Sequence, residues 1–137
     1  MQTINKIFET DRLFLRELSL DDLESVFQIF SDPIAMNFYP RTRNLEETKL
    51  RIQWNLDSYE KNAFGLWACI SKETEKFIGQ AGLIFYEDVN GQEEVEISCS
   101  FIRKYWRQRF ATETLRACID YGFHQLNLQR LIGMVHP

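Results

Sequence analysis

The chain has 137 residues, of which 45% are hydrophobic and 26% charged, and its formal net charge is −4. This length and composition predict one globular domain, 1–137, with a real hydrophobic core. The net acidity argues against nucleic acid as a partner. Without a signal peptide or a membrane-spanning apolar run, we expect a cytoplasmic protein with no membrane partner.

The three cysteines are widely spaced, at positions 69, 99 and 118. Zinc sites place cysteines in close pairs, and no such pair occurs, so no metal site is expected. We interpret the cysteines as small buried hydrophobic side chains in a reducing compartment.

The first half of the chain predicts a strand followed by two helices. Residues 1–9 are expected to form a short lead-in before an alternating strand at 12–18. Ser19 with an acid three residues later predicts a helix N-cap, and the short helix that follows ends before Ser31-Asp32-Pro33. Asn44 with Glu47 predicts a second capped helix, which runs to about residue 61. Its predicted apolar face comprises Leu45, Ile52, Leu56 and Tyr59.

The second half predicts a three-strand meander, a helix and a final strand. Strands are expected at 64–71 and 77–86, and Asn90-Gly91 predicts a tight hairpin into the next strand. The complete order is β-α-α-β-β-β-α-β, which predicts an α+β (mixed α/β) fold with a central mixed sheet flanked by helices. The last strand–helix–strand unit should be a right-handed crossover with parallel strands.

The stretch 93–126 combines a strand, a basic turn and a helix. The apolar face of the strand comprises Val95, Ile97, Cys99 and Phe101, and its polar face comprises Glu94, Glu96, Ser98 and Ser100. The helix is predicted to carry an apolar stripe of Leu115, Cys118, Ile119, Gly122, Phe123 and Leu126. Lys104, Arg107 and Arg109 crowd the helix N-terminus, whose first N–H groups lack internal partners. This arrangement predicts an anion-binding site.

Four segments then carry a resemblance to a known family. They read ETDRLFLR (9–16), EISC (96–99), YWRQRFATET (105–114) and RLIGMVHP (130–137). In this order they resemble the GCN5-related N-acetyltransferases, in the branch that contains the ribosomal-protein N-terminal acetyltransferases. That branch has an EIGY-like strand followed by a YWGxGYATEA turn. The resemblance covers nearly the whole chain.

The resemblance implies an enzyme that transfers acetyl from acetyl-CoA to a primary amine, either a protein N-terminus or a small amine. It implies that the central and final strands splay apart around the pantetheine arm. It places the pyrophosphate on the backbone from Arg107 to Thr112 and the pantetheine amides on the backbone around Phe101 to Arg103. The expected cofactor-binding residues are Phe101, Ile102, Arg103, Arg107, Gln108, Arg109, Phe110, Ala111 and Thr112.

The resemblance also matches Glu96 to the glutamate of the family's strand motif, which suggests it as the general base. Glu93 and Glu94 compete for that role, and the alternative is an outward-facing carboxylate on a half-solvated strand. For the leaving-group acid, Tyr39, Tyr105, Tyr121 and bulk water all stay open.

The sequence departs from the family pattern at two points, and these favour a second hypothesis for the function. Arg107 and Arg109 stand where the family has glycines, and the family continues beyond residue 137 through a helix and a strand pair. We therefore expect a domain that lacks this segment, with an apolar edge on the strand 131–135 that is covered by a homodimer or a strand exchange. The departures favour the alternative of a degenerate, non-catalytic binding or interaction module.

Overall fold

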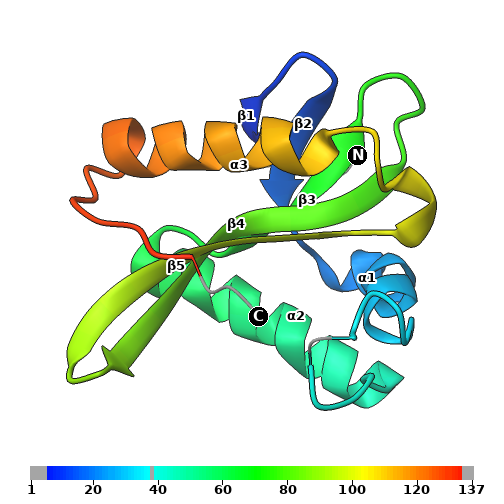
Figure 1. Ribbon diagram of the computed structural model, residues 1–137, viewed down its shortest axis with the longest axis horizontal. Coiled ribbons are helices and arrows are strands. Elements are labelled where there is room, and N and C mark those ends of the chain that lie inside the picture. Colours follow the sequence, from blue (N-terminus) through cyan, green and yellow to red (C-terminus); the bar gives the residue numbers. More distant parts are fainter. Residues whose placement is uncertain (1–5, 38, 134–137) are drawn as a thin grey trace.

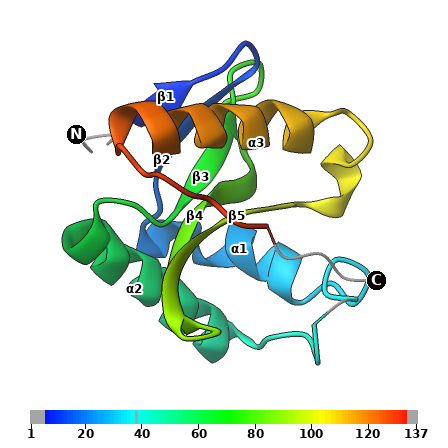
Figure 2. The ribbon, with the colours of Figure 1, turned by 60° about the vertical axis from the view of Figure 1, so that its left-hand side comes forward.

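A five-stranded antiparallel sheet forms the centre of the molecule, with strands in the order β1-β2-β3-β4-β5. The computed structural model describes residues 6–37 and 39–133. Helix α3 covers one face of the sheet, and α1 and α2 cover the other, as Figures 1 and 2 both show. The α+β prediction is therefore confirmed. The elements are β1 (Lys6–Glu9), β2 (Leu13–Glu17), α1 (Leu23–Phe30), α2 (Leu45–Asn62), β3 (Leu66–Ser71), β4 (Phe77–Val89), β5 (Gln92–Phe101) and α3 (Phe110–Asp120).

The first strand corrects the prediction of a lead-in at residues 1–9, because residues 6–9 form β1. This strand pairs antiparallel with β2, with Phe8 opposite Leu15. The Phe8 ring also packs edge-on against Trp67, with ring centroids 5.9 Å apart. A strand of four residues is too short for its alternation to stand out in the sequence, so only its tertiary partners reveal it.

Both predicted helix caps are confirmed. At the first, Ser19 caps a short 3-10 turn, Leu20–Asp22, that leads into α1. The Ser19 side chain accepts from the Asp21 N–H at 3.2 Å, and the Asp22 carboxylate accepts from the Ser19 N–H at 2.9 Å. Asp22 also accepts from Arg16 at 2.8 Å, which ties this cap to β2. At the second, Asn44 and Glu47 exchange hydrogen bonds of 2.8 and 3.0 Å. These reciprocal bonds satisfy N–H groups that a helix start leaves without partners.

The predicted apolar face of α2 is confirmed at Ile52, which is 1% exposed, but not at Leu45, and the buried face also includes polar residues. Leu45 is 49% exposed, whereas the buried residues include Thr48, Asn55 and Ser58. The Asn55 side chain accepts from the Leu66 N–H at 2.8 Å, and the Ser58 hydroxyl donates to the Phe64 carbonyl at 2.6 Å. The helix is therefore held against the start of β3 by hydrogen bonds as well as by apolar contact.

The hairpin between β4 and β5 is confirmed at Asn90-Gly91. Asn90 and Gly91 have φ values of 53° and 87°, as a two-residue turn of the I′ type requires. The register places Ile84 opposite Glu96 and Tyr86 opposite Glu94. Because side chains alternate along a strand, these four side chains share one face of the hairpin.

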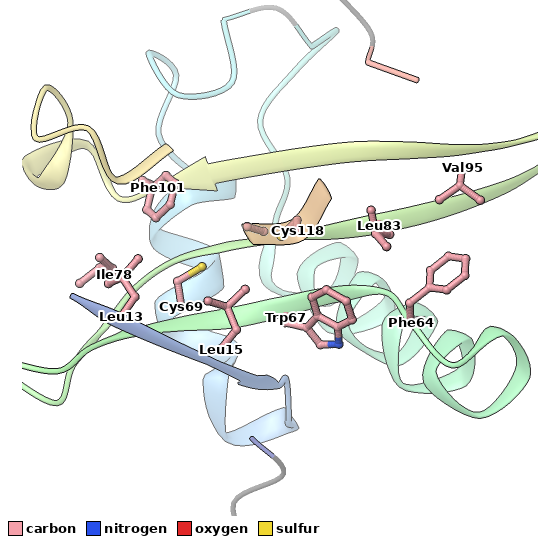
Figure 3. Close-up of a cluster of buried hydrophobic side chains, with 11 residues drawn as sticks. Leu13, Leu15, Phe64, Trp67, Cys69, Ile78, Leu83, Val95, Phe101 and Cys118 are labelled. Atoms are coloured by element: carbon pink, nitrogen blue, oxygen red, sulfur yellow. The ribbon is translucent and has the colours of Figure 1, made fainter. Parts of the chain in front are cut away.

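The core confirms the predicted apolar face of β5. Val95 and Phe101 are buried in one cluster with residues of β2, β3 and β4, and Cys118 joins them from α3 (Figure 3). The buried cysteines act as hydrophobic side chains, because burial raises the pKa of Cys118 to about 12 and keeps its thiol protonated.

The predicted stripe of α3 is wrong at Ile119 and Phe123, which are each 38% exposed. It is confirmed at Cys118 and Gly122, which are buried, and Thr114 is buried as well. Residues Tyr121–Gln125 form a π-helical turn, which rotates the end of the helix relative to a regular α-helical stripe.

A parallel contact lies at the outer edge of β5. The Ile132 N–H donates to the Val95 carbonyl, and the Ile97 N–H donates to the Ile132 carbonyl, both at 2.9 Å. This pairing begins the parallel strand that the sequence predicts. The remainder of that strand, residues 134–135, and with it part of the proposed dimer edge, lies outside the described residues. No helix within the described ranges has the length and apolar character needed to cross a bilayer.

Candidate active site

The turn before α3 keeps a left-handed backbone without glycine. Arg107 and Arg109 have φ values of 67° and 65°. This conformation costs a non-glycine residue about 1–2 kcal/mol. The two arginines therefore occupy the backbone shape that glycine would take most easily, and the resemblance places glycines at these positions.

The N-terminus of α3 is open to an anion. Its N-cap residue, Arg109, contributes no side-chain cap. Within the described ranges, no acceptor is recorded for the N–H groups of Phe110, Ala111 and Thr112. Unpartnered N–H groups and the helix dipole both favour negative charge at this point.

A cavity of about 1170 Å³ connects this helix end with the two N-terminal helices. It passes along the polar face of β5, so one continuous space joins the turn, the strand and the helix layer on the far side of the sheet. Its lining includes Arg107, Arg109, Phe110 and Ala111 from the turn, Glu96, Ser98 and Ser100 from β5, and Phe30, Arg43 and Arg51 from the helix layer.

The structure brings five of the predicted cofactor-binding residues to this cavity. They are Phe101, Arg107, Arg109, Phe110 and Ala111. The other four lie outside its lining. Ile102 donates its N–H to the Ile78 carbonyl at 2.9 Å, Arg103 pairs with Asp32 at 3.2 Å, and Gln108 is exposed. Thr112 borders a separate, smaller hollow beside the turn between β1 and β2.

An open backbone edge lies at Cys99. The Ile97 N–H points to the outer edge of β5, where it reaches Ile132. Backbone groups alternate between the two edges of a strand, so those of Cys99 face the same outer edge. Further along, the Phe101 carbonyl accepts from the Trp106 indole at 2.8 Å. Cys99 also lines the cavity, so an extended amide-bearing chain can pair with the strand there.

Among the three candidate glutamates, Glu96 lies in the cavity. It is 7% exposed, and the Tyr86 hydroxyl donates to its Oε1 at 3.2 Å. The interpretation of Glu96 as an outward-facing carboxylate is therefore wrong, because the cavity and the helix layer cover this face. Glu93 is exposed, and Glu94 is buried and paired with Arg130 at 2.9 Å.

Tyr86 is held as a hydrogen-bond donor to Glu96. Burial raises the pKa of Tyr86, and the negative charge of Glu96 and the hydrogen bond between them raise it further. The phenol therefore stays protonated at neutral pH. Sequence reasoning missed this residue, since only the hairpin register places it diagonally across from Glu96.

The three candidate tyrosines separate into two groups. Tyr39 and Tyr105 line the cavity. Tyr121 lies in the core on the opposite face of the sheet, with its ring centroid 5.3 Å from those of Phe8 and Trp67. Its ring is therefore occupied by core packing.

Glu113 fixes the start of α3 to the turn between β1 and β2. Its carboxylate accepts from the Thr10 hydroxyl, from the Arg12 N–H at 3.0 Å and from the Arg12 guanidinium at 2.7 Å. That guanidinium lies over the Phe110 ring, 4.1 Å from its centroid. Burial opposes ionisation of Glu113, yet these hydrogen bonds outweigh it and lower its pKa from 4.5. The contacts orient the helix end that borders the cavity.

We expect Glu113→Gln to lower the free energy of unfolding by about 1–2 kcal/mol at pH 7, because it removes charged hydrogen bonds. A lowered pKa stabilises the fold above pH 4.5 and loses that effect as the pH falls through the folded-state value. The difference between wild type and variant, measured by urea unfolding, should therefore shrink at acid pH. Glu60→Gln, at an exposed position on α2, is the control. A difference that stays constant with pH would contradict this role.

The comparisons with known proteins agree with this geometry. The profile of the acetyltransferase (GNAT) domain matches residues 12–137. An uncharacterized N-acetyltransferase, p20 of Bacillus licheniformis, is 34% identical over 131 residues, which cover 93% of this chain and 72% of that protein. These findings support an acetyltransferase and do not favour the alternative of a non-catalytic module.

Solved structures share the fold. An acetyltransferase from Agrobacterium tumefaciens superposes with a TM-score of 0.81 at 23% identity, covering 100% of this chain and 77% of that one. A putative ribosomal-protein-serine acetyltransferase from Vibrio cholerae gives 0.74 at 23% identity, covering 95% and 74%. The family expected from the four sequence segments is confirmed: the chain belongs to the GNAT acetyltransferases.

Proposed function

We propose that this protein transfers the acetyl group of acetyl-CoA to a primary amine, either a protein N-terminus or a small amine. The observation that carries the proposal is the continuous cavity from the open N-terminus of α3 to the buried carboxylate of Glu96. It offers an anion site at one end and a base at the other. Both substrates of a direct transfer can be held in it together.

In this proposal, the end of the cavity at α3 binds the cofactor. The N–H groups of Phe110 and Ala111 donate hydrogen bonds to the pyrophosphate oxygens, and the guanidinium groups of Arg107 and Arg109 add charged donors. The pantetheine amides pair with the open edge of β5 at Cys99. This geometry brings the thioester toward the middle of the cavity.

Glu96 then acts as the general base. It removes a proton from the acceptor ammonium group, with Tyr86 holding the carboxylate in place. The amine nitrogen attacks the thioester carbonyl carbon, the new C–N bond forms and the C–S bond breaks. The attacking nitrogen loses its second proton as the amide forms, and the CoA thiolate takes up a proton, so that proton can pass to the thiolate through water or one of the tyrosines in the lining. The products are an N-acetylated amine and CoA.

Calorimetric titration of acetyl-CoA tests the cofactor end of the proposal. We expect micromolar binding to the wild type and about tenfold weaker binding to an Arg107→Gly, Arg109→Gly double variant, since two charged donors are removed. The variant should not be less stable. Relief of the left-handed strain, about 1–2 kcal/mol per site, exceeds the added freedom of glycine in the unfolded chain, about 0.5–1 kcal/mol.

Lys104→Ala removes a neighbouring exposed charge that lies outside the cavity lining, so it serves as the charge control. Tighter binding by the double variant would mean that the arginines obstruct the site. An absence of binding to both proteins would contradict the proposed use of acetyl-CoA.

A further inference from the structure

The acceptor end of the cavity contains two arginines that form no salt bridge with a described carboxylate. Arg43 precedes α2 and Arg51 lies within it, and both line the cavity that contains Glu96. Neither belongs to any ion pair recorded within residues 6–37 and 39–133. By contrast, Arg41, two residues before Arg43, is paired with Glu47.

Both guanidinium groups rest on aromatic rings. The Arg43 guanidinium lies over Phe30, 5.1 Å from the ring centroid, and that of Arg51 lies over Trp54 at 4.3 Å. Stacking uses the face of the guanidinium plane and leaves the in-plane N–H donors available. The rings therefore hold the arginines in position without occupying their donors.

The two positive charges are close enough to act on each other. Burial lowers the pKa of Arg51, and the positive charge of Arg43 lowers it further; the negative charge of Glu96 in the same cavity offsets these effects only in part. Two neighbouring cations in a partly buried cavity repel each other, and a bound anion relieves that repulsion. Planar carboxylates and phosphates are the anions that the guanidinium fork binds best.

We propose that the acceptor is a primary amine that also carries a carboxylate or a phosphate group, which Arg43 and Arg51 bind while Glu96 faces the amine. This inference rests on the proposed acetyl transfer and specifies its substrate class. It assigns the two arginines to acceptor specificity. It also disfavours polycationic amines, because their remaining charges would lie beside the arginine pair.

Matched amine pairs test the inference by the rate of CoA release from acetyl-CoA. Ethanolamine phosphate against ethanolamine isolates the phosphate, and β-alanine against β-alaninamide isolates the carboxylate. For at least one pair, we expect kcat/KM of the wild type to be about tenfold or more higher for the anionic member. The pair that shows the preference identifies the anion.

Arg51→Gln and Arg43→Gln should each raise KM for the preferred anionic amine about 10–100-fold, with kcat and the neutral amine little affected. Arg51→Lys keeps the positive charge but loses the bidentate guanidinium group, so its KM should lie between those of the wild type and of Arg51→Gln. Lys49→Gln, an exposed position on the same helix, is the matched charge control. Equal rates for charged and neutral amines, a preference for spermidine, or unchanged KM values in the variants would overturn the inference.

A second measurement does not depend on turnover. Each anionic amine is titrated calorimetrically into protein saturated with CoA. If the wild type binds the anionic amine and Arg51→Gln does not, the arginine site is supported even when no acetylation is detected. In that case only the proposed acetyl transfer would be overturned. Acetylation of neutral amines without any anion binding would leave the proposed function standing and overturn the acceptor class.

Discussion

Replacing Glu96 by glutamine is expected to lower kcat about 10²–10⁴-fold, the usual contribution of a positioned general base. Glutamine keeps the size and hydrogen-bonding capacity of the side chain, so the contact with Tyr86 persists. The affinity for acetyl-CoA should be unchanged, because the cofactor's anionic groups are assigned to the far end of the cavity. Steady-state CoA release and calorimetric binding together separate the two effects.

Glu94→Gln is the matched control for this experiment. Both carboxylates are 7% exposed and lie on the same face of β5, but Glu94 pairs with Arg130 and is absent from the cavity lining. The control should retain most of the activity. An equal loss in both variants would mean that the effect is structural. A fully active Glu96→Gln enzyme would remove Glu96 from the mechanism.

Local sequence signals predicted much of the fold because their physical causes are local. Ser19 and Asn44 cap helices through residues three positions away, and Asn90-Gly91 sets its own turn geometry. The open N-terminus of α3 was also predictable, since a strand, a basic turn and a helix start follow one another in the chain. The residues of this turn, Arg107 and Arg109, line the cavity as expected.

The proposed acceptor end could not be predicted, because its residues meet only in the folded chain. Tyr86 approaches Glu96 through the register of a long hairpin, and Arg43 and Arg51 approach them from the opposite layer. The polar residues on the buried face of α2 could not be predicted for the same reason. From the sequence, Asn55 would be assigned to the surface, but its side chain accepts a hydrogen bond from the backbone at the start of β3. Hydrophobic periodicity detects buried apolar faces but not buried polar ones.

The structure also differs from the expectation at Arg107 and Arg109, which adopt left-handed backbone conformations. Sequence reasoning interpreted the missing glycines as lost backbone freedom at the phosphate turn. The backbone nevertheless adopts φ values of 67° and 65° there. The surrounding elements impose this shape, notably through the Glu113 contacts that fix the first turn of α3. The backbone conformation of this turn therefore could not be judged from residue type alone, because tertiary contacts also determine it.

Gly82→Ala should produce the largest loss of stability, about 3 kcal/mol in the free energy of unfolding. A Cβ atom at Gly82 would lie 2.2 Å from the Gly65 carbonyl oxygen and 3.0 Å from the Leu66 Cα. Both are backbone atoms at the start of β3, so no side chain can move aside. The Leu83 N–H donates to that same carbonyl at 3.1 Å, and relieving the clash would lengthen this bond.

The loss should extend to the active site, because β4 also carries Ile84 and Tyr86 into the cavity. Urea unfolding measures the stability, and Gly133→Ala is the control, since no atom of the described residues lies within 4 Å of a Cβ there. A low urea midpoint with an unchanged slope for Gly82→Ala alone would confirm that β3 and β4 meet backbone to backbone. If both variants unfold at the same urea concentration, the two strands cannot approach as closely as the register of Leu66 with Gly82 requires.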